Sequence, residues 1–120
     1  MHLRELKINK ELGRKEGMAT DYGNLGNVYM TREELDRAEE MYLKTLEIDT
    51  GLGRKEGLAI TYANRGLIAE ERGDSVKARD LWTKSRDLYD EIGIPHEVKR
   101  AQGLLDGLEN GLDGDRDDGA

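Results

Sequence analysis

The chain of 120 residues contains no cysteine, no phenylalanine and a single proline. Without cysteine, a disulfide framework, a thiol nucleophile and a cysteine metal site are excluded. The only histidines, His2 and His96, are not spaced from other ligands as zinc sites require. The only serines, Ser75 and Ser85, lie in no nucleophile motif. These absences predict that the protein is not an enzyme and that it uses no metal and no cofactor.

Long apolar runs and clustered basic residues are also missing. The sequence has no run of about 18 apolar residues that could span a membrane, and no charged start followed by an apolar stretch as in a signal peptide. The net charge is -7, and residues 106–120 contribute six acidic residues against one basic residue. Because nucleic-acid binding depends on clustered Lys and Arg, we expect no nucleic-acid partner. Because the sequence has neither a membrane span nor a signal peptide, we also expect no membrane partner and a cytoplasmic location.

What the sequence does contain is an internal repeat. The hexapeptide Leu-Gly-Arg-Lys-Glu-Gly occurs at residues 12–17 and again at residues 52–57. Over the longer comparison of residues 12–26 with residues 52–66, 10 of 15 positions are identical. Residues 1–12 align with residues 41–52, so the chain opens midway through a repeat. A fixed period of 40 residues indicates a stacked-repeat architecture.

Apolar residues within each period recur in steps of three and four, which is typical of amphipathic helices, and strand-like alternation is absent from the sequence. Each period therefore predicts a pair of helices. We expect inner helices near 15–31 and 55–71, outer helices near 35–51 and 75–91, a terminal helix before Gly13, and a capping helix near 96–109.

The repeated hexapeptide is interpreted as a joint between helices. Gly13 and Gly53 stand where a glycine in left-handed conformation would end one helix, and the next helix would begin within the Arg-Lys-Glu that follows. A phosphate-binding loop would need several glycines after a strand, which this motif does not have.

Two further glycines, Gly26 and Gly66, fall in the middle of predicted helices, where each costs about 1 kcal/mol relative to Ala. Close approach of the partner helix would explain them. On the inner helices we expect the core to contain Tyr22, Leu25, Tyr29, Tyr62, Gly66 and Ala69.

The residues Tyr22-Gly-Asn-Leu-Gly-Asn-Val-Tyr29, followed by Ala38, Tyr42 and Leu46, resemble tetratricopeptide repeats. The 40-residue period is more similar to the longer-repeat branch of kinesin light chains and spindle-orientation adaptor proteins than to the common form of roughly 34 residues. Glu33 departs from the pattern, which has glycine at this turn. The resemblance implies an all-α fold, a right-handed α-solenoid of antiparallel helix pairs with a C-terminal capping helix.

The same alignment predicts the domain organisation. A repeat domain over residues 1–109 would contain a half repeat at 1–12, full repeats at 13–52 and 53–92, and the cap helix at 95–109. Residues 110–120 are mostly glycine and aspartate, so we expect a disordered acidic tail there.

The resemblance implies a protein-protein interaction module that binds an extended peptide or a partner protein in its concave groove. An amide suits this task because it both donates and accepts hydrogen bonds, as a peptide unit does. Arg100 would favour an acidic residue or a carboxylate terminus. An equally weighted alternative is that Asn24 and Asn64 bridge adjacent helices, while Ile60 and Leu67 pack against the cap. The candidate peptide-binding residues are Asn24, Asn27, Met30, Ile60, Asn64, Leu67 and Arg100.

Two other functions remain open at this point: a self-assembling scaffold, and a regulatory fragment of a larger signalling protein. The terminal helix before Gly13 has no inner helix beside it, and its apolar stripe of Leu3, Leu6 and Leu12 is expected to stay partly uncovered. We therefore predict a homodimer that forms through the repeat ends or by exchange of an end helix.

Overall fold

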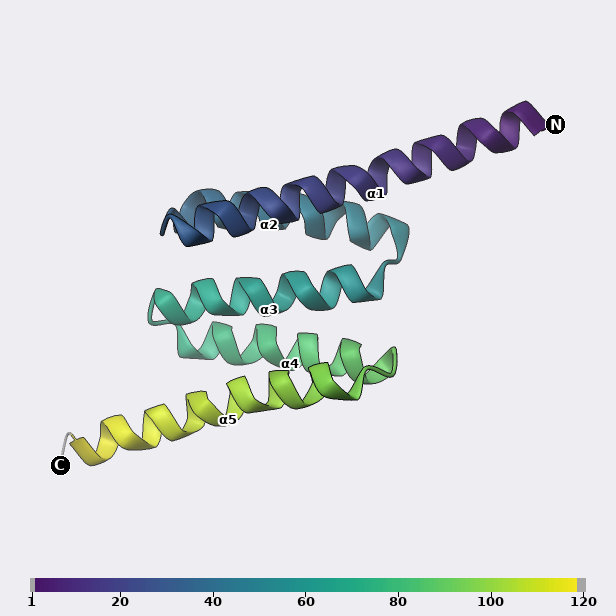
Figure 1. Cartoon of the computed structure of the whole chain (residues 1–120). Coiled ribbons are helices and arrows are strands. Elements are labelled where there is room, and N and C mark those ends of the chain that lie inside the picture. Colours follow the sequence, from purple (N-terminus) through teal and green to yellow (C-terminus); the bar gives the residue numbers. More distant parts are fainter. Residues whose placement is uncertain (1, 119–120) are drawn as a thin grey trace. The chain divides into compact units, whose positions relative to one another are not determined.

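The computed structural model describes the backbone of residues 2–118 and the side chains of residues 11–110. Over this range the chain forms five α-helices and no strand, which confirms the predicted all-α fold (Figure 1). None of the described helices combines the length and the apolar character that a membrane span requires. The helices are α1 (His2–Thr31), α2 (Leu35–Leu52), α3 (Lys55–Glu71), α4 (Ser75–Glu91) and α5 (Pro95–Asp118).

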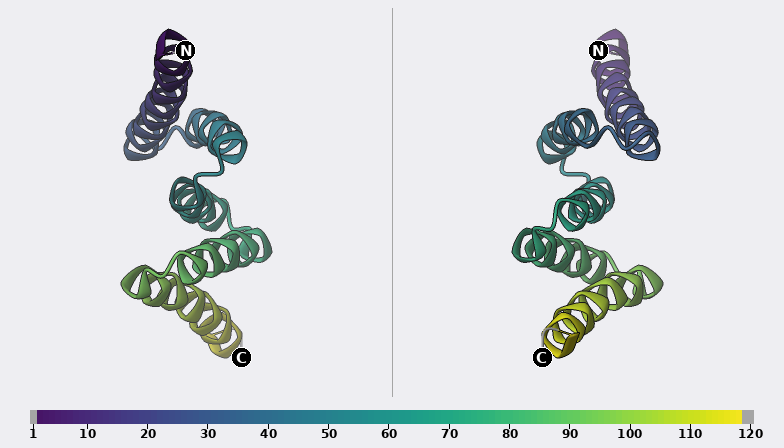
Figure 2. Two further views of the ribbon diagram at one scale, coloured as in Figure 1. Left: turned by 90° about the vertical axis from the view of Figure 1, so that its right-hand side faces the viewer. Right: turned by 90° about the vertical axis from the view of Figure 1, so that its left-hand side faces the viewer.

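The chain divides within α3 into two compact units, unit 1 (Met1–Thr61) and unit 2 (Tyr62–Ala120). In unit 1, α1 and α2 lie side by side and run in opposite directions (Figures 1 and 2). In unit 2, α5 lies against α4 in the same antiparallel manner. The first helix pair predicted from the apolar spacing, α1 with α2, is therefore present, and the bounds of α2, α3 and α4 agree with the predicted ones to within one residue.

A glycine on α1 allows α1 and α2 to approach closely. A Cβ added to Gly26 would lie 2.5 Å from Cε1 of Tyr42, so no larger residue fits without displacing that ring. The hydroxyl of Thr45 donates a hydrogen bond of 3.0 Å to the carbonyl of Ala19. Ala19, Ala38 and Tyr42 are almost completely buried. The predicted reason for a glycine in the middle of this helix is confirmed.

Unit 2 has the same contact between a glycine and an aromatic ring one period later. A Cβ on Gly66 would overlap the indole of Trp82, and Nε1 of Trp82 donates a hydrogen bond of 3.1 Å to the carbonyl of Ala63. The capping helix α5 closes this side of the unit with apolar side chains. The resulting core consists of Ala69, Ala78, Leu81, Trp82, Leu105 and Leu108.

The turns between helices follow the same 40-residue period. Gly53 and Gly93 have φ angles of 69° and 75°, and Gly73 has φ of 78°. Glu33, one period before Gly73, adopts φ of 62° although it is not a glycine. Because a side chain is strained in the left-handed region, Glu33 holds this turn at an energetic cost that Gly73 avoids.

The prediction that a helix ends at Gly13 is wrong, because α1 continues without a break from His2 to Thr31. At the second copy of the hexapeptide, the chain turns where Asp49 forms an ion pair with Arg54 and where Gly51 weakens the last turn of α2. The equivalent positions before Gly13 hold Asn9, which has no charge, and Glu11, which favours helix. The expected half repeat and the first inner helix are therefore one element.

Two other differences concern packing and the C-terminus. Leu25, expected in the core, is 44% exposed, because none of the described helices of unit 1 covers that side of α1. The capping helix was expected at 96–109, but α5 continues to Asp118 and includes most of the segment predicted to be disordered. No proline follows Pro95, and the glycines after it do not turn the chain before Asp118.

Candidate functional site

The seven residues predicted to bind a peptide belong to three helices. Asn24, Asn27 and Met30 follow one another in steps of three on α1, and they therefore share one side of that helix. Ile60 completes the set in unit 1. The remaining three, Asn64 and Leu67 on α3 and Arg100 on α5, belong to unit 2.

Two of the three asparagines have available amides. Asn24 is exposed and Asn64 is half-buried. Neither side chain has a hydrogen-bond partner among the described residues, so the bridging role considered for them is not observed there. Both amides can donate to and accept from a ligand backbone.

Asn27 has a second role that the sequence reasoning missed. Its Oδ1 accepts a hydrogen bond of 2.6 Å from the hydroxyl of Tyr42. Burial raises the pKa of Tyr42 to about 12, so the phenol stays protonated and remains a donor at neutral pH. This bond fixes the orientation of the Asn27 amide, although Asn27 is an exposed residue.

A comparison of the two repeats contains the signal for this bond. One period later, Leu67 replaces Asn27 and Trp82 replaces Tyr42, so both partners of the hydrogen bond change together. Trp82 instead donates to the carbonyl of Ala63. A paired change of this kind indicates contact between the two positions.

The remaining predicted residues differ in their surroundings. Ile60 is 45% exposed. Leu67 packs against the unit 2 core that contains Leu105 and Leu108 of the cap, as the alternative interpretation expected. Arg100 is exposed, and its Nη1 lies 3.9 Å from a carboxylate oxygen of Glu97, which offsets part of its charge.

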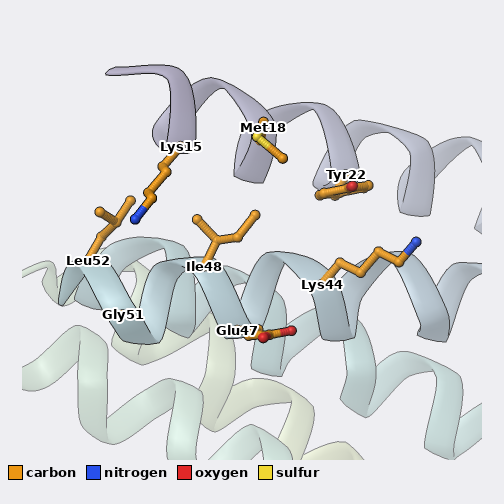
Figure 3. A pocket seen from close by; sticks show the side chains of 8 residues that line it. All are labelled: Lys15, Met18, Tyr22, Lys44, Glu47, Ile48, Gly51 and Leu52. Atoms are coloured by element: carbon orange, nitrogen blue, oxygen red, sulfur yellow. The ribbon is translucent and has the colours of Figure 1, made fainter. Parts of the chain in front are cut away.

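A groove between α1 and α2 in unit 1 was not predicted. It encloses about 510 Å³ between α1 and α2, and in Figure 3 the side chains of Met18, Tyr22 and Ile48 point into the space between the two helices. Nζ of Lys44 lies 5.2 Å from the centre of the Tyr22 ring, a cation–π contact at the rim. We call this the α1–α2 groove; it is lined by Lys15, Met18, Tyr22, Lys44, Glu47, Ile48, Gly51 and Leu52.

A metal site would need a cluster of ligand side chains, and the part of the chain whose side chains are described contains none. Over residues 11–110, no three His, Asp or Glu side chains come together as a metal ion would require. Groups available to a ligand include the amides of Asn24 and Asn64 and the apolar lining of the α1–α2 groove.

The chain was also compared with known protein families. The family model described as tetratricopeptide repeat matches residues 17–91, which extend from the middle of α1 to the end of α4. A search of curated proteins found no match to the chain.

Proposed function

The chain belongs to the tetratricopeptide repeat family, and on this basis we propose that it is a non-catalytic interaction module that binds an extended peptide along its inner helices. Repeats of this family generally mediate protein-protein interaction. The period of 40 residues supports placing the chain in the longer-repeat branch of the family.

The observation that carries the proposal is the state of the asparagine amides. Asn24 has no hydrogen-bond partner among the described residues and is exposed. Asn27 is oriented in advance by Tyr42, which occupies its oxygen and leaves its two N–H donors. A donor that is already oriented loses less conformational entropy when a peptide binds. Both groups therefore suit the carbonyl groups of an extended backbone.

Other members of the set would determine which peptide binds. Met30 is half-buried and Ile60 is 45% exposed, so both present apolar surface to a ligand side chain. Arg100 is only weakly paired with Glu97 and would favour an acidic residue or a free carboxylate.

The test uses Asn24 and Asn64 rather than Asn27, because a change at Asn27 would also remove the acceptor of the Tyr42 hydroxyl. A peptide ligand is first selected from a library of extended peptides with the wild-type chain. In the double variant Asn24→Ala and Asn64→Ala, affinity should fall tenfold or more, because each lost hydrogen bond contributes about 1 kcal/mol.

The matched control is Asn110→Ala, since Asn110 is an exposed asparagine outside the predicted set. Calorimetry measures the affinities, and circular dichroism checks that helicity is retained. If the double variant binds as tightly as the wild type and as the control, Asn24 and Asn64 do not belong to the peptide site.

A further inference from the structure

One face of α1 is apolar and uncovered in unit 1. Met18, Leu25 and Val28 are 43%, 44% and 46% exposed, respectively, although large apolar side chains are usually buried. The α1–α2 groove lies along this face and shares Met18 with it. None of the seven predicted peptide-binding residues lines this groove.

The repeat shows what covers the equivalent face of the next inner helix. At the start of α3, the carboxylate of Asp49 from α2 lies directly against Gly57, where a Cβ would overlap it. Arg54, next to the start of α3, forms an ion pair of 3.3 Å with the same carboxylate. Thr61, one turn after Gly57, is buried. The second half of an outer helix therefore packs on the start of the inner helix that follows it.

The equivalent positions on α1 lack such a cover. Nothing lies within 4 Å of a Cβ built on Gly17, which corresponds to Gly57. Asp21, which corresponds to the buried Thr61, is exposed. The first inner helix thus has the small residue that receives an outer helix at the second copy. Among the described residues, however, no outer helix lies against this glycine.

The sequence contains the missing outer helix in residues 1–12, which align with the second half of α2. Leu3, Leu6, Ile8 and Leu12 correspond to Leu43, Leu46, Ile48 and Leu52, and Asn9 corresponds to Asp49. However, α1 is unbroken through Gly13, so its N-terminal segment continues along the helix axis and does not turn back toward α2 (Figure 1). At about 1.5 Å per residue, Asn9 and Gly17 are about 12 Å apart along the helix axis.

We propose that the α1–α2 groove and the adjoining face of α1 bind residues 2–12 of a second copy of this chain, so that two copies exchange their N-terminal helical segments. By the repeat register, Asn9 of the second copy meets Gly17 of the first. Each copy provides one segment and one groove, so the same contact forms twice about a twofold axis, as in other exchanged dimers.

The lack of cysteine allows a direct test by disulfide formation. The double variant Asn9→Cys and Gly17→Cys carries both partners of the proposed contact. Within one straight helix the two positions are too far apart for a disulfide, which needs Cα atoms within about 7 Å. On mild oxidation we expect a covalent dimer on a non-reducing gel, with helicity retained by circular dichroism.

The control double variant Asn9→Cys and Thr31→Cys places the second thiol at the exposed end of α1. We expect that this variant does not form the covalent dimer. A disulfide within one chain would mean that residues 1–12 fold back on their own copy, and it would overturn the proposal. So would the absence of any disulfide in the test variant, or equal cross-linking in the control.

Light scattering on cysteine-free variants provides an independent measurement. Met18→Glu places a charge in the groove, and we expect it to weaken dimerisation about tenfold or more. Leu43→Glu is the matched control, because Leu43 is equally exposed but does not line the groove, and its dimerisation should match that of the wild type. A wild-type monomer at all accessible concentrations, or equal effects of the two variants, would contradict the exchange.

Discussion

The carboxylate of Asp49 is an unusual group at the scale of single residues, because it is only 2% exposed and lies between α2 and α3. Burial raises its pKa above the ordinary value of 3.8, Arg54 opposes this shift, and Glu16 adds to it. Gly57 is required beside it, since a side chain there would occupy the space of the carboxylate. One buried acid and one glycine therefore determine how closely α3 approaches α2.

The raised pKa predicts a pH dependence of stability. The folded chain holds the Asp49 proton more tightly than the unfolded chain, so this stabilisation is complete below pH 3.8 and is lost as the pH rises through the folded-state pKa. Asp49→Asn cannot ionise, and its free energy of unfolding should therefore rise relative to that of the wild type across this window.

Urea denaturation of both proteins between about pH 3 and pH 7 measures this difference. The comparison is made with the wild type at each pH, because all other carboxyl groups titrate in both proteins. If the difference in the free energy of unfolding stays constant or falls as the pH rises, burial does not destabilise the ionised carboxylate of Asp49.

At the scale of elements, the two copies of the hexapeptide adopt different structures. In the second copy, Gly53 adopts φ of 69°, and the amides of Gly53 and Arg54 donate to the carbonyls of Thr50 and Asp49. This is a helix end of the type that glycine favours. In the first copy, Gly13 lies within α1, and nothing lies within 4 Å of a Cβ built there. The same six residues thus end one helix and continue another.

Alanine substitution should therefore have opposite effects at the two glycines. Gly53→Ala forces a side chain into the left-handed region and should destabilise the fold by about 1 kcal/mol. Gly13→Ala improves the propensity of a helix interior and should stabilise it by up to about 1 kcal/mol. Thermal or urea denaturation of the two variants provides the comparison, and destabilisation of similar size in both would mean that Gly13 is also a helix end.

Much of this element-level structure could be predicted from the sequence. The apolar spacing located α2, α3 and α4, and the glycines at 26 and 66 correctly indicated close helix contacts. The continuity of α1 could not be predicted, because the local motif is identical in both copies. What differs is the residues before it, where Asn9 and Glu11 stand in place of Asp49 and Gly51.

At the scale of the whole molecule, the family and its fold were evident from the repeat, whereas the candidate surfaces were only partly so. The positions of Asn24, Asn27 and Met30 on one side of α1 follow from helical spacing. The bond between Asn27 and Tyr42 depends on how two helices pack, which spacing within one helix does not reveal. The α1–α2 groove depends on how the side chains of two helices pack, and a repeat alignment that assumes a turn at Gly13 does not reveal it.

The exchange of N-terminal segments requires that α1 runs unbroken through the first copy of the hexapeptide. The double variant Lys7→Cys and Asp21→Cys is spin-labelled and diluted with unlabelled protein. Pulsed electron paramagnetic resonance then measures the distance between the two labels within one chain. A continuous helix predicts about 21 Å between the two backbone positions. A distance distribution centred near 10 Å would show that the chain turns back at Gly13, and it would overturn both the continuous α1 and the exchange.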